Sequence, residues 1–263
     1  MRHKSIVMKK LIAFITRIFP RQWLIKLSYV FSFFIRPFYW GNKVECPVCG
    51  KHFRKFLPYG YGVAMDNRLC PNCLSLERHR LLWLYLKEKT DFFSAPLKVL
   101  HFAPEQPFLK RFRALKNLDY TTADLCSPIA DLQLDVTDIQ QPDNTFDVVI
   151  CNHVLEHVNN ANKAFAEIKR ILKPGGWAIL LVPINPDVDT FEDPSVTDPK
   201  ERERLFGQYD HVRQFGRDYA DVLRKAGFQV VEDRLYYELP NDQRERMHLA
   251  RRGEEIIYKC VKA

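Results

Sequence analysis

Four of the seven cysteines stand in two pairs whose spacing is typical of a metal site. The first pair is Cys46-Pro-Val-Cys49, followed by Gly50, and the second is Cys70-Pro-Asn-Cys73. Two such turns can place four thiolates around one tetrahedral Zn²⁺, each turn supplying two ligands. Four thiolates leave no position open for water, so we predict a structural zinc ion. A lost metal site and a redox pair are the alternatives.

The other three cysteines bear on the compartment. Cys126, Cys151 and Cys260 stand alone, and the total is odd. This usage suits a reducing compartment better than a disulfide framework. We therefore expect a cytoplasmic protein.

A second set of polar residues follows short apolar runs between Lys98 and Pro183. Each run is rich in β-branched or aliphatic residues, and helical segments separate most of them. This alternation is typical of a parallel sheet with helices on both faces. In such sheets ligands bind beyond the carboxyl ends of the strands, where strand order reverses. The sequence therefore predicts a ligand site formed by the residues at these ends, namely Glu105, Asp124, Asp135, Asn152 and His153.

The elements that position these residues can be placed along the chain. The predicted strands cover residues 98–102, 120–123, 132–134, 146–151, 177–183, 228–231 and 255–261. The predicted helices include 74–91, 106–115 and 217–225. We expect an α/β fold, with a doubly wound, mostly parallel seven-stranded sheet and a small N-terminal zinc ribbon. The expected domains are an arm (1–43), the zinc ribbon (44–75) and a sheet domain (76–263) with a linking helix (76–91) and an acceptor-side insertion (185–216).

The N-terminal arm is basic and aromatic. Residues 1–43 hold nine lysines and arginines and no acidic residue, which accounts for the net charge of +8 and leaves the remainder nearly neutral. The longest stretch without a basic residue, 27–35, is much shorter than the roughly 20 residues of a spanning helix, and no signal peptide is indicated. The composition favours two helices, broken at Pro20, on a membrane surface. The alternatives are docking on the protein's own body, membrane spanning and RNA binding.

The segment from Leu97 onward resembles class I S-adenosylmethionine-dependent methyltransferases, specifically the methyltransferase type 11-like group. The residues that carry the resemblance are VLHFAPE at 99–105, Asp124, LDVTD at 134–138, FDVVICNHVLEHV at 146–158 and LKPGGWAILLVPI at 172–184. Residues 206–230 also resemble bacterial proteins that carry the same CxxC module. The resemblance implies a last strand that runs antiparallel, inserted beside the sixth.

The resemblance implies S-adenosylmethionine as cofactor and gives roles to the residues at the strand ends. Asp124 would bind the two ribose hydroxyls, and Asp135 with the Val136 backbone would bind adenine, whereas Asn152 and His153 face the methionine end. A helix N-cap for Asp124 and a turn role for Asp135 are the alternatives. The first motif lacks the family's usual glycine-rich turn and acid, and has instead His101, Phe102, Ala103, Pro104 and Glu105.

Two functions are open to Glu105 in this motif. It either replaces the missing acid or caps the helix that follows. Ala103 is nearly as small as the glycine that usually allows close approach to the ligand.

The acceptor side is predicted within residues 185–216. Its polar, proline-containing part, 185–203, is typical of a lid or binding loop. Methyl transfer to a hydroxyl needs positioning and a base, and histidine has a suitable pKa. We predict His211, beside Asp210, as the base and His153 as the second choice. Alternatively, Asp210 and His211 only tie the lid to the next helix.

The HVLEH run at 153–157 suggests a metal but does not fit a zinc hydrolase. If it were helical, His153 and His157 would share a face. In HEXXH the glutamate follows the first histidine, whereas Glu156 precedes the second, which excludes that motif.

The leading hypothesis is a methyltransferase that acts on a hydroxyl of a small molecule or lipid-linked glycan, peripheral to the inner face of a membrane. One alternative is a ribosomal or transfer RNA base methyltransferase, because a zinc knuckle precedes this domain there as well. The neutral body argues against it, since RNA binding relies on many phosphate contacts. Another alternative is a membrane adaptor that has lost its cofactor site.

Overall fold

The computed structural model describes residues 21–60, 64–127 and 129–263. Its N-terminal part consists of one helix, a 3₁₀ turn and two antiparallel hairpins. The bounds are α2 (Arg21–Ile35), η1 (Arg36–Tyr39), β1 (Trp40–Cys46), β2 (Lys51–Phe53), β3 (Leu57–Tyr59) and β4 (Met65–Leu69). The predicted helix break at Pro20 and the arm before it lie outside the described residues.

The central sheet has seven strands in the order β13-β14-β9-β8-β5-β6-β7. Its parallel strands are β5 (Leu97–Phe102), β6 (Leu118–Asp124), β7 (Leu132–Gln133), β8 (Phe146–Cys151) and β9 (Leu172–Ile179). Strand β14 (Ile257–Val261) lies between β9 and β13 (Gln229–Asp233) and is antiparallel to both. This arrangement confirms the predicted fold class and the antiparallel last strand. The strand order reverses at β5 and β8, where the ligand site was predicted.

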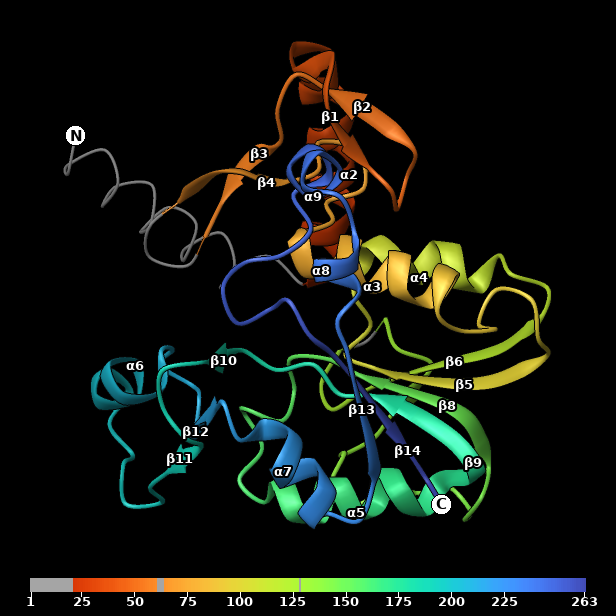
Figure 1. Cartoon of the computed structure of the whole chain (residues 1–263), viewed down its shortest axis with the longest axis vertical. Helices are drawn as coiled ribbons and strands as arrows, with labels where there is room; N and C mark the ends of the chain where they lie inside the picture. The colour runs from red at the N-terminus through yellow and green to blue at the C-terminus, as the bar shows by residue number, and fades with distance from the viewer. Residues whose placement is uncertain (1–20, 61–63, 128) are drawn as a thin grey trace.

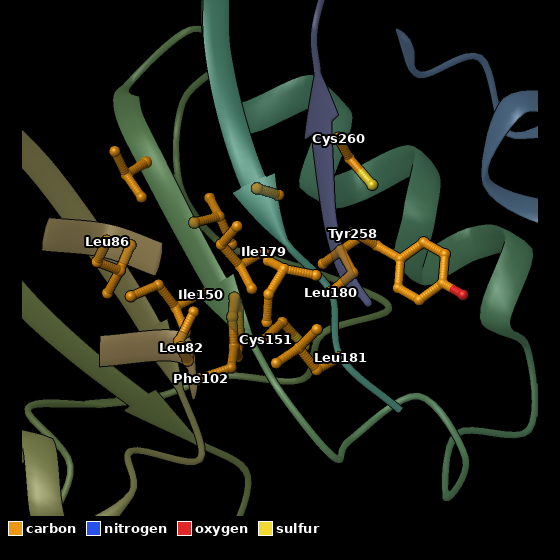
Figure 2. Close-up of a cluster of buried hydrophobic side chains, with 14 of the residues drawn as sticks. Leu82, Leu86, Phe102, Ile150, Cys151, Ile179, Leu180, Leu181, Tyr258 and Cys260 are labelled. Atoms are coloured by element: carbon orange, nitrogen blue, oxygen red, sulfur yellow. The ribbon is translucent and has the colours of Figure 1, made fainter. Parts of the chain in front are cut away.

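Helices cover both faces of this sheet (Figure 1). α3 (Glu77–Glu88) and α4 (Gln106–Arg113) lie on one face, and α5 (Ala161–Ile171) and α7 (Tyr219–Lys225) lie on the other. Figure 2 shows Leu82 and Leu86 of α3 close to the buried strand residues Phe102 and Ile150. Burial on both sides explains why the strands are continuous apolar runs rather than alternating ones.

Two predicted regions differ from the structure. Strand β9 begins at Leu172, before the Pro-Gly-Gly turn, and ends at Ile179; its regular pairing with β8 resumes at Trp177 after an irregularity. The acceptor-side insertion is not an open loop. It contains β10 (Ile184–Asn185), β11 (Phe191–Glu192), α6 (Pro199–Phe206) and β12 (Arg213–Gly216), with the three strands paired as β10-β12-β11.

The zinc ribbon and the sheet domain share one hydrophobic core. Between them lies Arg80 of α3, whose side chain is fully buried. It donates hydrogen bonds to the carbonyl oxygens of Arg68 and Ser75 on one side, and of Met247 and His248 at the end of α9 (Asn241–Met247) on the other. Short helix α8 (Leu235–Glu238) precedes α9. One guanidinium thus links the zinc ribbon to a segment that lies 167 and 168 positions later in the sequence than Arg80.

Candidate active site and metal centre

The four paired cysteines converge. The sulfur atoms of Cys46, Cys49, Cys70 and Cys73 all lie within 4.8 Å of one another. The Cys46–Cys73 and Cys49–Cys70 sulfur distances are 3.5 and 3.8 Å. Zn–S bonds of about 2.3 Å in a tetrahedron place sulfur atoms about 3.8 Å apart. The residues present therefore fit a zinc ion.

Both CxxC turns have the same backbone geometry. The N–H of Gly50 donates to the Cys46 carbonyl at 2.8 Å, and the N–H of Leu74 donates to the Cys70 carbonyl at 3.0 Å. Gly50 and Leu74 have positive φ angles, 64° and 60°. Glycine adopts this conformation readily, whereas leucine does so at a cost. The second turn is therefore held in place by its surroundings rather than by residue preference.

A cavity of about 890 Å³ opens at the carboxyl edge of the central sheet. This size lies within the range of small-molecule sites. Its walls come from the ends of β5 and β6, from the segments after β7 and β8, and from the segment after α6. The lining residues are Phe102, Ala103, Asp124, Leu125, Cys126, Leu134, Asp135, Val136, Thr137, His153, Val154, His157, Val158, Asn159, Asn160, Gln208 and Asp210.

Asp124 and Asp135 lie on the wall of this one cavity. Each carboxylate is oriented by its own turn. Oδ1 of Asp124 accepts the N–H groups of Cys126 and Ser127 at 2.9 and 2.7 Å, and Oδ1 of Asp135 accepts from the backbone and hydroxyl of Thr137. The described part of the connection between β6 and β7 contains no helix, so the contacts of Asp124 stabilise a turn rather than a helix N-terminus.

The first motif contains a buried polar network. His101 is fully buried; its Nε2 lies 2.5 Å from Oε2 of Glu105, and its Nδ1 lies 2.7 Å from the Tyr120 hydroxyl. Oε1 of Glu105 accepts from Nδ2 of Asn152 at 3.0 Å. Burial by itself raises the pKa of Glu105, but the positive field and hydrogen bond of His101 outweigh it and lower the pKa to about 2. The Glu105 side chain makes no helix-capping hydrogen bond.

This network lies beneath the cavity and fixes its floor. Neither His101, Glu105 nor Asn152 lines the cavity, whereas Phe102, Ala103 and His153 do. Ala103 and His153 both have positive φ angles, 45° and 54°. Ala103 thus takes the left-handed conformation that glycine would adopt most easily. Although this motif has no glycine, its backbone therefore still passes along the cavity wall.

The acceptor side brings together residues that are distant in the sequence. Oδ2 of Asp210 lies 3.4 Å from Nδ1 of His157, so the Asp210 carboxylate contacts His157 rather than His211 as expected. His211 is 8% exposed, and its Nδ1 donates to the Phe206 carbonyl at 3.0 Å. Residues 155–157 form a turn, and α5 begins only at Ala161. The helical spacing considered for the HVLEH run is therefore wrong.

Sequence reasoning did not single out Arg213, which holds this turn. Its side chain is 3% exposed and donates to the carbonyl oxygens of Leu155, Val158 and Asn159. The guanidinium also pairs with Glu192 at 2.8 Å. Arginine can satisfy several carbonyls because it has five donors in a planar fork. No local pattern in the sequence indicates these contacts, since they join segments more than 50 residues apart.

Helix α2 docks on the protein through its polar side. Ser32 donates to the Pro71 carbonyl, Arg36 donates to Oδ1 of Asn72 at 2.7 Å, and Ser28 accepts from Gln106 at 2.9 Å. The opposite side is apolar and faces outward. Trp23, Leu27, Val30, Phe31 and Phe34 are each 48–67% exposed there, at the spacing of one helical face.

Just beyond α2, Phe38 and Trp40 are 72% and 83% exposed. We call these two residues and the five on α2 the aromatic face. Among the described residues, no helix meets the length and apolarity required to cross a membrane.

Residues 90–180 match the family described as a methyltransferase domain. The matched stretch runs from before β5 through β9 and supplies most of the cavity wall. Residues 90–180 form a class I methyltransferase domain. The strand order of the complete sheet agrees with this identification, because the antiparallel β14 lies between β9 and β13.

Two curated proteins are similar in sequence to part of this chain. The ubiquinone/menaquinone biosynthesis C-methyltransferase UbiE of Hydrogenovibrio crunogenus is 52% identical over 97 residues, which are 37% of this chain and 30% of that protein. An uncharacterized protein of Methanocaldococcus jannaschii is 37% identical over 99 residues, 38% of this chain and 37% of that protein. The chain thus spans about a third of the length of these relatives.

Solved structures are similar to the methyltransferase domain at low identity. The 1,6-didemethyltoxoflavin-N1-methyltransferase of Burkholderia thailandensis, solved with bound 1,6-didemethyltoxoflavin and S-adenosylhomocysteine, is 14% identical and has a TM-score of 0.44, with 71% of this chain and 78% of that one covered. The YcgJ protein of Bacillus subtilis is 14% identical with a TM-score of 0.43, covering 70% and 94%. At these identities and TM-scores, the structural likenesses support no conclusion beyond the one that the strand order already gives.

Proposed function

We propose that this chain is an S-adenosylmethionine-dependent methyltransferase that binds its donor in the cavity of the methyltransferase domain. The observation that carries the proposal is that Asp124 and Asp135, from adjacent strands, line one cavity. In the proposed complex Asp124 accepts hydrogen bonds from the two ribose hydroxyls. Asp135 and the Val136 backbone bind adenine. Carboxylates suit these donors because ionised acceptors form the stronger hydrogen bonds.

The methionine end of the donor is assigned to the ends of β5 and β8. Phe102 and Ala103 form the wall there, and His153 lies across from them on the same cavity. His101, Glu105 and Asn152, predicted as direct cofactor ligands, are proposed to act from beneath by holding the backbone of this turn. The cofactor supplies an electrophilic methyl group, and the protein aligns an acceptor with it.

We propose a hydroxyl acceptor and a histidine base. His153 is better placed to remove the proton, because it lies on the cavity wall with its side chain 20% exposed. His211 is the second candidate base. Its Nδ1 donates to the Phe206 carbonyl, which leaves Nε2 as the proton acceptor. Asp210 orients His157 in this arrangement.

The proposed acceptor is a small molecule or a lipid-linked glycan. The acceptor end of the cavity carries amide and carboxylate groups that suit polyhydroxylated compounds, namely Asn159, Asn160, Gln208 and Asp210. The body beyond the N-terminal arm is nearly neutral, which disfavours RNA because RNA affinity depends on many phosphate contacts.

We further propose that the aromatic face binds a lipid bilayer surface. α2 turns its polar side toward the zinc ribbon and α4, so the apolar side is left largely exposed. Exposed apolar patches on folded proteins mark interaction sites. Aromatic residues favour the membrane interface, where basic residues add attraction to anionic lipids. This placement would bring a lipid-linked acceptor to the protein.

We propose that the four cysteines hold one structural Zn²⁺. The sulfur geometry supports a closed tetrahedral site. Ser75 adds a contact to the site, since its hydroxyl lies 3.1 Å from the sulfur of Cys46. Such contacts around the ligands orient a metal site.

Untargeted mass spectrometry of glycans and lipids tests the acceptor proposal. Cells with and without the gene are compared, and the gene-deleted cells are complemented with wild-type protein or Asp124→Asn. We expect a compound class that lacks one methyl mass in deleted cells and recovers it only with wild-type protein. A methyl difference confined to RNA would instead support the RNA alternative. Identical profiles in all cells would contradict the proposed acceptor class.

A further inference from the structure

Two histidines and a glutamate form a cluster behind the acceptor end of the cavity. Glu156, His157 and His211 each offer one ligand atom, and these atoms lie within 4.8 Å of one another. Glu156 is 2% exposed, whereas the His157 side chain is 34% exposed and lines the cavity. The N–H of Val212 donates to the Glu156 carbonyl at 2.9 Å. This bond brings His211 beside residues that lie more than 50 positions earlier.

The Glu156 carboxylate has one oxygen that lacks a hydrogen bond. Its Oε2 is buried and accepts none from the described residues. Its Oε1 lies 3.4 Å from Nδ1 of His153. A buried polar atom without a partner costs free energy and calls for an explanation. A cation next to Oε2 would remove this cost.

Each histidine of the cluster has one ring nitrogen already held. Nδ1 of His211 donates to the Phe206 carbonyl, and Nδ1 of His157 lies 3.4 Å from the Asp210 carboxylate. In both rings Nε2 is then the nitrogen that can bind a metal. Metal-ligating histidines are oriented in this way, with the other N–H bound to a carbonyl or a carboxylate. The two rings meet edge to face, with centroids 4.8 Å apart.

We propose that Glu156, His157 and His211 bind a divalent first-row transition cation, for which Zn²⁺ is the test ion. Two imidazoles and a carboxylate are a ligand set that such ions favour. Metal–ligand bonds of about 2.1 Å place tetrahedral ligands about 3.4 Å apart, so the side chains close around the ion by rotation. Three protein ligands leave one position open, unlike the four-cysteine site.

The ion would take the acceptor oxygen as its fourth ligand, a role that rests on the proposed function. A bound cation lowers the pKa of a coordinated hydroxyl. His153 would take the proton of the breaking O–H bond. The oxygen would then bond to the donor's methyl carbon, while the electron pair of the broken C–S bond would pass to sulfur. His211 serves in this scheme as a ligand, which leaves His153 as the base.

The zinc content of the full-length protein tests the site. Wild type, Glu156→Gln and His157→Gln are incubated with Zn²⁺, freed of unbound ion by gel filtration and analysed by mass spectrometry of the metal. We expect each variant to hold one equivalent less than wild type. Glu203→Gln is the matched control, because it removes the same charge from the exposed side of α6 and should keep the wild-type content. Circular dichroism checks that each variant is folded. Because the His157 side chain is partly exposed, its substitution should disturb the fold less than substitution of the buried Glu156.

Equal zinc content in all four proteins would overturn the proposal and show that the cluster is a network of imidazoles and a carboxylate without metal. S-adenosylmethionine binding is measured on the same samples. Its absence from wild type would refute the proposed function, whereas the zinc difference between variants would still report on the metal site.

Discussion

The Glu105 carboxylate connects two buried polar side chains beneath the cavity. The sequence left its role open between acid and helix cap. In the structure its two oxygens contact His101 and Asn152, and none caps α4. The residue therefore joins the ends of β5 and β8 beneath the cavity. The sequence could not decide this, because both roles require only an acid before a helix.

The acid sensitivity of the fold should depend on Glu105. Its pKa of about 2 lies below the ordinary value of 4.5, so the charged form stabilises the native state above about pH 4.5. This contribution, about 3 kcal/mol at most, is lost as the pH falls from 4.5 toward 2. Urea unfolding of wild type and Glu105→Gln between pH 6 and 3 should show a stability difference that shrinks with acidification. A constant difference, with the exposed-site variant Glu88→Gln as reference, would argue against the network.

The cysteine site makes a second prediction for single residues. Cys46→Ser should lose one equivalent of zinc, because three thiolates cannot close the tetrahedron. Cys126→Ser, at an exposed cysteine outside the two pairs, should keep the wild-type content. Metal analysis measures both. Equal zinc in the two variants would mean that the thiolates do not hold the ion.

Among the elements, the strands were predicted well and the connections poorly. Strands β5 and β8 are buried on both faces, so their apolar runs identify them, and Asp124 and Asp135 follow from where the strands end. The spacing of the histidines in the HVLEH run would also fit a helix, but the run forms a turn. Its conformation is set by Arg213 and by the Val212–Glu156 hydrogen bond. Contacts of this range leave no periodic signal in the sequence.

Arg213→Met should destabilise the acceptor side strongly. The change leaves the buried carbonyl of Leu155 and the partly buried carbonyls of Val158 and Asn159 without their donor, at a cost of about 3 kcal/mol. For a chain of this size that corresponds to a fall in Tm of about 8 °C. Arg217→Met, at an exposed ion pair with Asp189 on the same segment, should change Tm little. Differential scanning calorimetry compares them, and equal effects would refute the bracing role of Arg213.

At the scale of the whole molecule, α2 and the zinc ribbon form one end and the central sheet the other (Figure 1). The sequence predicted an amphipathic helix here but not the direction of its faces. The structure shows that short polar side chains, Ser28 and Ser32, contact the body. The aromatic side is left exposed, whereas the usual burial of apolar side chains would have suggested that it faces the body.

Vesicle sedimentation tests whether the exposed side of α2 binds a membrane surface. Phe31→Ser with Phe34→Ser removes apolar area from the exposed side and should reduce binding to vesicles of phosphatidylethanolamine and phosphatidylglycerol severalfold. The control is Tyr209→Ser, at a residue of similar exposure on the acceptor side. Unchanged sedimentation of the double variant would exclude the aromatic face as the membrane contact.

The most direct test of the account is calorimetric titration of the full-length protein with S-adenosylmethionine. Wild type should bind one equivalent. Asp124→Asn should bind about 100-fold more weakly, because two charge-assisted hydrogen bonds of about 1.5 kcal/mol each are lost. Asp119→Asn, at the other end of β6, should bind like wild type. Absence of binding by wild type, or equal affinity of Asp124→Asn, would contradict the claim that the cavity holds the methyl donor.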